Sequence, residues 1–90
     1  MKIKVKAFGD LKRLLDNETI IEIEDDSGLE DLFSKLAIMT RTYKKGFIGS
    51  HKVGSDLTVL INGRNMNVLE APSPLRDGDT VELLPFSVGG

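Results

Sequence analysis

The 90-residue sequence predicts a single α+β domain in which one main helix packs across a mixed β-sheet. Three observations predict this fold class. Residues 2–8 alternate between apolar and charged side chains, as a strand with one face in water does. Residues 29–37 repeat apolar side chains at helical spacing. Residues 57–61 and 80–84 are rich in strand-forming side chains, and each segment adjoins a turn signal.

The composition excludes several classes of protein. There is no cysteine, which excludes disulfides, thiolate metal sites and a cysteine nucleophile. The single His51 excludes a site that needs two imidazoles. No apolar run approaches the roughly 20 residues of a membrane-spanning helix, and the start lacks the apolar core of a signal peptide. With a net charge of -2, we expect a cytoplasmic protein whose partners include neither nucleic acid nor a membrane.

The charged residues are segregated along the chain. Residues 16–31 carry only acidic charges, at Asp16, Glu18, Glu22, Glu24, Asp25, Asp26, Glu30 and Asp31. Residues 32–52 carry only basic charges, at Lys35, Arg41, Lys44, Lys45 and Lys52. One interpretation is that these are the solvated faces of neighbouring elements. The other is a docking surface for a charged partner, because opposite charges steer encounter.

Two strands with a short helix between them are predicted in the first part of the chain. Residues 2–8 form the first strand. Its inner face consists of Ile3, Val5 and Ala7, and its lysines lie in water. Asp10 is expected to cap a short helix that continues to Leu15. Residues 18–24 form the second strand, with Ile20 as an extra apolar residue on the acidic side.

The main helix has the clearest start signal. Ser27 and Glu30 fit a capping box, and Asp31 adds negative charge to the first turn. The apolar stripe that follows consists of Leu29, Leu32, Phe33, Leu36 and Ala37. Residues 41–56 are basic and contain three glycines, so we expect a long, mobile loop that could include a turn of helix.

The remaining chain predicts short strands and turns. These are a central strand at 57–61, an Asn62-Gly63 turn, a return strand at 65–69, an irregular segment at 71–75, an Asp77-Gly78-Asp79 turn, and a last strand at 80–84 that Pro85 stops. This order of elements matches a β-grasp, ubiquitin-like roll. A ferredoxin-like split βαβ fold is the main rival, but it needs a second long helix, and residues 62–79 offer none.

Sequence patterns for bound ligands and for catalysis are missing. The glycines are scattered, and none forms a phosphate-binding strand-to-helix turn. His51 follows Ser50 without a strained elbow, so we expect an exposed loop residue rather than a base. Asp25 and Asp26 are interpreted as charges at the helix entry rather than as a metal site. We expect no metal and no bound cofactor.

The end of the sequence has an unusual pattern. A confident strand leads into residues 87–90, which carry no charge and end in Gly89-Gly90. We expect a β-grasp domain over residues 1–86 followed by a flexible Gly-Gly tail. Two residues without a Cβ can enter a channel too narrow for other side chains. The reactive group would then be the α-carboxylate of Gly90.

With these features the chain resembles the MoaD/ThiS family of ubiquitin-like sulfur carriers, and within it the MoaD-like small subunits of molybdopterin synthase. The resemblance covers nearly all of the chain. It is carried by residues 3–8 and 11–15, the helix residues Leu29, Leu32 and Leu36, residues 59–64, residues 74–85, and Gly89-Gly90. The family usually has two prolines after the last strand, whereas here Pro85 is followed by Phe86.

The resemblance implies a sulfur carrier rather than an enzyme. An E1-like partner would use ATP to adenylate Gly90, and a persulfide from another protein would displace AMP to leave a thiocarboxylate. The tail, Ser87, Val88 and Gly89 included, would enter the large subunit of molybdopterin synthase, where the sulfur is donated to a pterin precursor. The candidate partner-binding residues are Phe8, Leu84, Pro85 and Phe86.

Two other functions stay open at this point. One is a ubiquitin-like modifier joined to lysines of target proteins through Gly90. Archaeal modifiers and the eukaryotic ubiquitin-related modifier share this fold and tail. The other is a plain β-grasp interaction domain, which needs no activating enzyme and would tolerate deletion of the tail.

Overall fold

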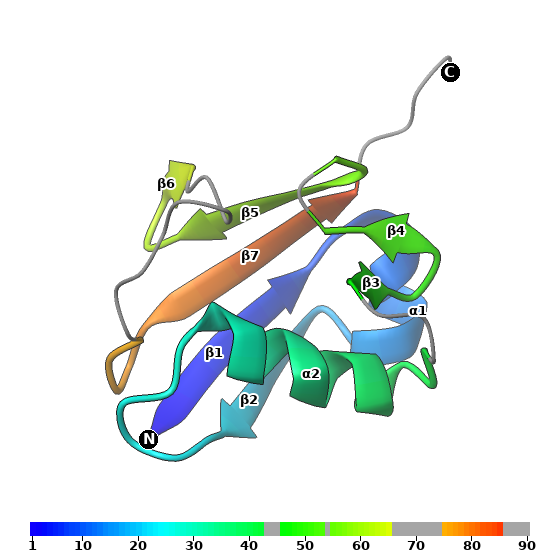
Figure 1. Ribbon diagram of the computed structural model, residues 1–90. Coiled ribbons are helices and arrows are strands. Elements are labelled where there is room, and N and C mark those ends of the chain that lie inside the picture. The colour runs from blue at the N-terminus through cyan, green and yellow to red at the C-terminus, as the bar shows by residue number, and fades with distance from the viewer. Residues whose placement is uncertain (43–45, 54, 66–74, 86–90) are drawn as a thin grey trace.

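The computed structural model describes residues 1–42, 46–53, 55–65 and 75–85 (Figure 1). The predicted return strand beyond Asn65, the irregular segment up to residue 74 and the Gly-Gly tail lie outside the described residues. The main sheet contains β1 (Lys2–Ala7), β2 (Glu18–Glu22), β5 (Leu57–Ile61), β6 (Arg64–Asn65) and β7 (Thr80–Pro85). Its strand order is β2-β1-β7-β5-β6.

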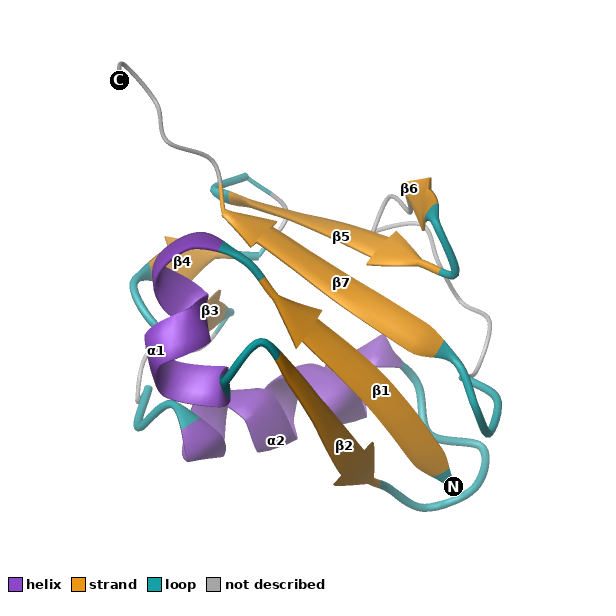
Figure 2. Cartoon of the chain, turned by 180° about the vertical axis from the view of Figure 1, so that it is seen from behind, coloured by secondary structure: helices purple, strands orange, loops and turns teal. Residues whose placement is uncertain are grey.

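The sheet is mixed, as predicted. β1 and β7 are parallel, and every other neighbouring pair is antiparallel. β7 is the middle strand, and β5, predicted as a central strand, has neighbours on both sides, β7 and the short β6. Helix α2 (Leu29–Met39) crosses one face of the sheet, and Figure 2 shows the opposite face without a helix. This arrangement is the β-grasp fold.

The core lies between α2 and the sheet. Leu29, Leu32 and Leu36 of α2 are buried, whereas Phe33 and Ala37 at the side of the stripe are half-buried. On the sheet, the alternation predicted for β1 is confirmed, since Ile3, Val5 and Ala7 are buried. β5 and β7 also bury alternate residues, namely Leu57, Val59, Val81 and Leu83. Ile20 of β2 is 53% exposed on the opposite face.

The start of α2 differs from the predicted capping box. Gly28, not Ser27, is the N-cap, so the third helical residue is Asp31 rather than Glu30. The Asp31 carboxylate accepts a hydrogen bond of 3.0 Å from the Gly28 amide. Only this half of a capping box can form, because glycine has no side chain to bond back to the helix.

A small hairpin occupies the predicted loop, and the prediction of a long, mobile loop is wrong there. β3 (Phe47–Ile48) and β4 (His51–Lys52) pair antiparallel around Gly49 and Ser50. Gly49 has a φ of +61°, which suits the first position of a two-residue hairpin turn. The Ile48 side chain is fully buried, so the hairpin contributes to the core.

The hairpin is held from two sides. The Gly49 amide donates a 2.8 Å hydrogen bond to the Thr42 hydroxyl, just beyond α2. On the other side lie the 3-10 helix η1 (Gly9–Leu11) and helix α1 (Lys12–Leu15). A side chain at Gly49 would come within 3.2 Å of Leu14 and 3.3 Å of Leu11. The hairpin is therefore wedged between α1 and the end of α2.

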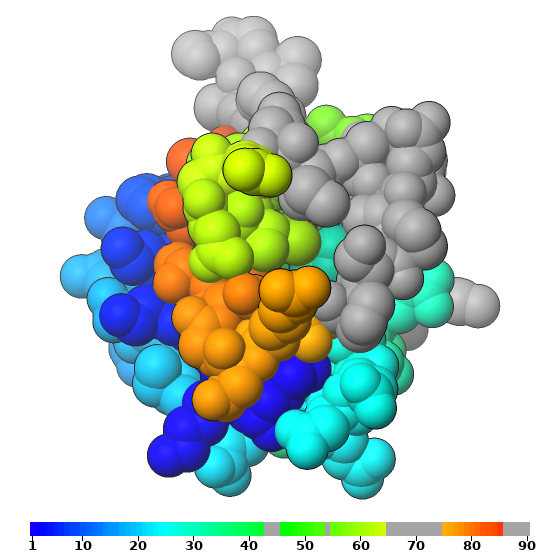
Figure 3. Space-filling view, turned by 90° about the vertical axis from the view of Figure 1, so that its left-hand side faces the viewer, coloured from blue at the N-terminus to red at the C-terminus, as the bar shows by residue number. Residues whose placement is uncertain are grey.

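Both predicted turns are present. Asn62 and Gly63 have φ values of 51° and 84° and connect β5 to β6. The Asp77-Gly78-Asp79 turn precedes β7, and Figure 3 shows this segment in orange beside the yellow-green β5–β6 turn. The Lys2 amide donates a 2.6 Å hydrogen bond to Asp77. No helix in the described part of the chain is long and apolar enough to span a bilayer.

Candidate functional site

The end of β7 is the last described part of the chain, and the predicted tail follows it in the sequence (Figure 1). β7 includes Pro85, one residue beyond the predicted end at Leu84. Pro85 is the last residue of β7 and pairs with Leu57 of β5. On the other side, a side chain at Gly9 would lie 3.4 Å from Cγ of Pro85. Because β5 and η1 flank Pro85, the strand end that carries the tail has a fixed position.

An apolar row leads to this point on the open face of the sheet. Phe8 donates its backbone N–H to the Leu83 carbonyl at 3.1 Å, which continues the β1–β7 register by one residue. Phe8 and Leu84 therefore lie side by side on the open face, and Thr58 pairs with Leu84 from β5. All three are half-buried. Half-buried side chains of this kind are available to a partner.

Charged side chains occupy the next rows. Lys6 of β1 pairs with Glu82 of β7, and Glu82 pairs with Leu60 of β5. An ion pair of 3.3 Å joins Lys4 to Glu18, with both side chains close to half exposed. Such exposed pairs add little stability. The open face is therefore apolar near Pro85 and charged farther from it, with Leu60 as an apolar residue beside Glu82.

The remaining predicted site residues cannot be placed. Phe86, Ser87, Val88, Gly89 and Gly90 lie outside the described residues. Of the predicted partner-binding residues, Phe8, Leu84 and Pro85 come together at the end of β7. The register places Leu60 and Thr58 on the open face with Phe8 and Leu84, whereas Pro85, which pairs with the buried Leu57, lies on the other face. The sequence signal for Leu60 and Thr58 was that successive side chains of a strand at 57–61 point to opposite faces. The nearly continuous apolar run in this segment concealed which face was which.

His51 is not the exposed loop residue that was predicted. It belongs to β4, its side chain is 14% exposed, and its Nε2 atom lies 2.8 Å from Oδ1 of Asp10. Asp10 makes this contact instead of capping a helix, since Phe8 is the N-cap of η1 and no side chain caps it. No group of three His, Cys, Asp or Glu residues that could hold a metal occurs among the described residues.

Comparison with known proteins decides the family. The model of the ThiS family matches residues 5–90. The chain belongs to the ThiS family. The residues matched by the family model include Phe8, Leu84, Pro85 and Gly89-Gly90. Comparison with curated protein sequences finds no significant match.

Three solved structures are similar to this ThiS-family chain. The putative molybdopterin converting factor subunit 1 of Pyrococcus furiosus is 26% identical, with 94% of this chain and 97% of that chain covered and a TM-score of 0.74. The small archaeal modifier protein 1 of Methanosarcina acetivorans is 27% identical, with 99% and 96% covered and a TM-score of 0.66. A complex of subunits 1 and 2 of the molybdopterin-converting factor from Helicobacter pylori contains a chain that is 24% identical, with both chains fully covered and a TM-score of 0.56.

These similar structures include subunits of molybdopterin-converting factors and a small archaeal modifier protein. The chain is thus a ubiquitin-like protein of the carrier or modifier type.

Proposed function

We propose that this ThiS-family protein is a sulfur carrier, a MoaD-like small subunit of molybdopterin synthase. The observation that carries the proposal is the family match over residues 5–90, which includes the Gly-Gly sequence. The similarity to subunit 1 of the Pyrococcus molybdopterin converting factor supports a pterin precursor as the acceptor of the sulfur. In this proposal sulfur is donated in the biosynthesis of the molybdenum or tungsten cofactor.

The proposed chemistry takes place at the carboxylate of Gly90. A carboxylate is a poor electrophile, so an E1-like enzyme first joins it to the α-phosphate of ATP, releasing pyrophosphate. A protein persulfide then displaces AMP and forms an acyl disulfide. A thiol cleaves that disulfide and leaves one sulfur on Gly90 as a thiocarboxylate. The chain supplies the reacting terminus, and the partners supply every catalytic group and the nucleotide site.

Docking would use the apolar end of the open face. Phe8 and Leu84 lie side by side there, and Pro85 is the last described residue before the tail. Phe86 would extend the same surface, and Leu60 borders it. The complex of subunits 1 and 2 from Helicobacter supports the large synthase subunit as one partner. The E1-like enzyme would be the other.

The test is removal of Gly90. The shortened protein should lose adenylation, followed as pyrophosphate exchange with an E1-like enzyme from the same organism. Its denaturation midpoint should match that of the parent, because residues beyond Pro85 contribute little to the core. Full exchange activity without Gly90 would contradict both the carrier and the modifier function and leave only an interaction domain.

A protein modifier is the second candidate, favoured by the 27% identity to the Methanosarcina modifier. The same activated Gly90 would then be joined to lysines of other proteins. Intact mass of the protein from its native cell separates the two functions. A carrier gains only the difference between a sulfur and an oxygen atom, whereas a modifier gains the mass of a whole target protein.

A further inference from the structure

Strand β2 forms one edge of the main sheet and pairs with β1 alone. The Ile23 amide bonds to the Met1 carbonyl at 3.0 Å, and the Ala7 amide bonds to the Asn17 carbonyl at 3.1 Å. In an antiparallel ladder, bonded and non-bonded pairs alternate. Therefore Ile21 and Thr19 also bond inward, and the backbone groups of Glu18, Ile20 and Glu22 point outward from the sheet.

Much of this outward edge is available. The Glu22 carbonyl accepts a hydrogen bond from Nζ of Lys35, which confirms its outward direction and occupies it. No described residue donates to or accepts from the backbone of Ile20 across this edge. Figures 1 and 2 show α2 over the face of the sheet rather than along this edge. An open strand edge of this kind can accept an added strand.

The side chains at the edge determine what kind of strand fits. On the open face β2 presents Glu18, Ile20 and Glu22, all of them exposed. On the side of β2 that faces β1, each of the two glutamates lies opposite a lysine, because Lys2 pairs with Glu22 and Lys6 pairs with Glu18. A strand added on the outer side meets the same side chains. It is therefore favoured if it carries basic residues at alternate positions.

A second copy of the chain is a poor occupant. If two β2 strands paired antiparallel about Ile20, each Glu18 would face the other copy's Glu22. Like charges directly opposite one another destabilise a strand pair. The glutamates thus oppose self-association while they favour a basic strand.

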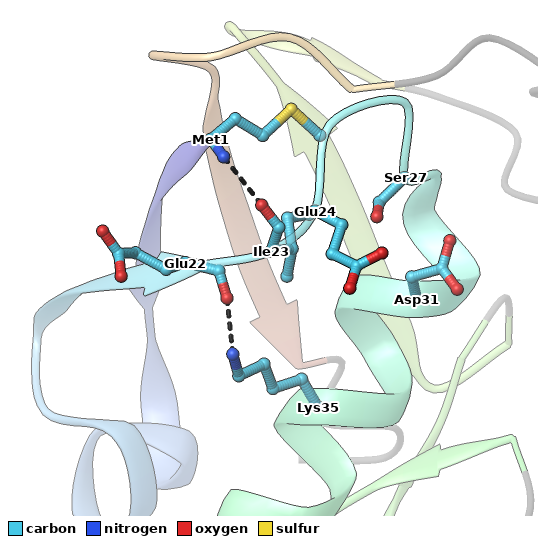
Figure 4. A pocket seen from close by; sticks show the side chains of 7 residues that line it. All are labelled: Met1, Glu22, Ile23, Glu24, Ser27, Asp31 and Lys35. Atoms are coloured by element: carbon cyan, nitrogen blue, oxygen red, sulfur yellow. Dashed lines mark hydrogen bonds between the residues drawn. The ribbon is translucent and has the colours of Figure 1, made fainter.

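A pocket continues this edge towards α2 (Figure 4). It has a volume of about 540 Å³ and lies between the end of β2 and the first turns of the helix. Its lining includes the side chains of Glu24, Asp31 and Lys35 and the amino terminus of Met1, whose ammonium group donates to the Ile23 carbonyl, whereas the Glu22 carboxylate points away from it (Figure 4). The charges in this pocket balance, so the preference for a basic strand depends on Glu18 and Glu22 of the edge itself.

We infer that the outer edge of β2 binds an extended, basic segment of a partner protein by strand addition. The open backbone at Ile20 provides the main-chain hydrogen bonds, and Glu18 and Glu22 select the charge. The surface is at the opposite side of β1 from β7, so it is separate from the tail and from the apolar row at Leu84. The inference is independent of the chemistry proposed for Gly90.

The test is an NMR titration of the ¹⁵N-labelled protein with the peptide acetyl-Lys-Val-Lys-Val-Lys-amide. Amide shifts should be largest at residues 18–22 and around Lys35, and the Ile20 amide should gain protection from exchange. The peptide in which the backbone nitrogens of all five residues are methylated has the same charge but lacks those donors in either strand direction. It should bind at least about tenfold more weakly. Equal binding by both peptides, or shifts centred elsewhere, would overturn strand addition.

Two protein variants complete the test. Ile20→Pro removes the outward N–H at an edge position where proline is tolerated, and it should abolish the shifts while the parent spectrum elsewhere is retained. Glu22→Lys should weaken binding by about fivefold, and Glu30→Lys, an equal charge change on α2, should weaken it much less. If Glu30→Lys weakens binding as much as Glu22→Lys, general attraction to acidic protein explains the data and the inference fails.

Discussion

The imidazole of His51 and the carboxylate of Asp10 are 2.8 Å apart although 41 positions separate them in the sequence. The contact joins β4 to η1, next to Gly9 and the end of β7. His51→Ala and Asp10→Ala should each lower the free energy of unfolding by about 0.5–1.5 kcal/mol. Urea denaturation of both variants and of the double variant measures this. A double variant that loses the sum of the two effects would show that the residues do not interact.

Substitution of Gly49 by any residue with a side chain should lower the stability of the protein. Gly49 and Gly46 both have a positive φ, but only Gly49 is crowded, by Leu14 and Leu11. Gly46→Ala should cost about 1 kcal/mol for backbone strain alone. Gly49→Ala should cost about 2–3 kcal/mol, because crowding adds to the strain. Thermal or urea denaturation compares the two, and equal costs would show that the neighbouring leucines move aside freely.

Leu36 anchors α2 in the core and is fully buried. Leu36→Ala should lower the free energy of unfolding by about 2–5 kcal/mol. Ile38, two residues along the same helix, is 77% exposed, so Ile38→Ala should change it by no more than about 0.5 kcal/mol. An unchanged denaturation midpoint in Leu36→Ala would contradict the packing of α2 against the sheet.

The hairpin should be protected from amide exchange. The Val53 amide donates to the Gly46 carbonyl at 2.9 Å, and the Gly49 amide is bonded to Thr42. Both amides should exchange more slowly than that of Ser50 at the tip of the turn. Exchange measured by NMR tests this. Equally fast exchange at all three amides would contradict the hairpin and support the mobile loop that the sequence predicted.

The apolar row should be needed for docking more than for stability. Leu84→Ala should raise the KM for the chain in pyrophosphate exchange by about tenfold, as the loss of a buried interface side chain does. Leu14→Ala removes an equally large side chain, 49% exposed on α1, and should leave KM unchanged. Equal effects of the two substitutions would place the docking surface elsewhere.

The tail should tolerate no bulk. Gly89→Val should prevent adenylation, since a β-branched side chain widens and stiffens the chain. One residue added after Gly90 should block the reaction as well, because the reacting carboxylate is moved. Ser87→Ala keeps the tail small and should react normally. Normal pyrophosphate exchange by the valine variant would show that no narrow channel receives the tail.

Much of the fold could be predicted because its signals are local. The alternation in β1 and the stripe from Leu29 to Ala37 identify the buried faces, and Asn62-Gly63 identifies a turn. The hairpin could not be recognised in this way, since β3 and β4 have two residues each and contain too little pattern. Gly49-Ser50, a two-residue turn beginning with glycine, was its one sequence signal.

The errors at Asp10 and His51 have a different cause. Asp10 has the right residue type and position for a helix cap, but its carboxylate is taken by a side chain 41 positions away. No local pattern contains such a contact. The candidate docking residues were predicted in part, because Phe8 and Leu84 stand out by position. Leu60 joins them only through the strand register, which sequence patterns do not specify.

The position of β7 in the middle of the sheet has a consequence for biosynthesis. The strand that joins β1 to β5 is made after every other described element has left the synthetic site. Until residues 80–85 are available, the β1–β2 pair and the β5–β6 pair have no common neighbour, and the core cannot close. A ribosome-bound or truncated chain that lacks these residues therefore presents open strand edges and exposed apolar side chains to chaperones and proteases.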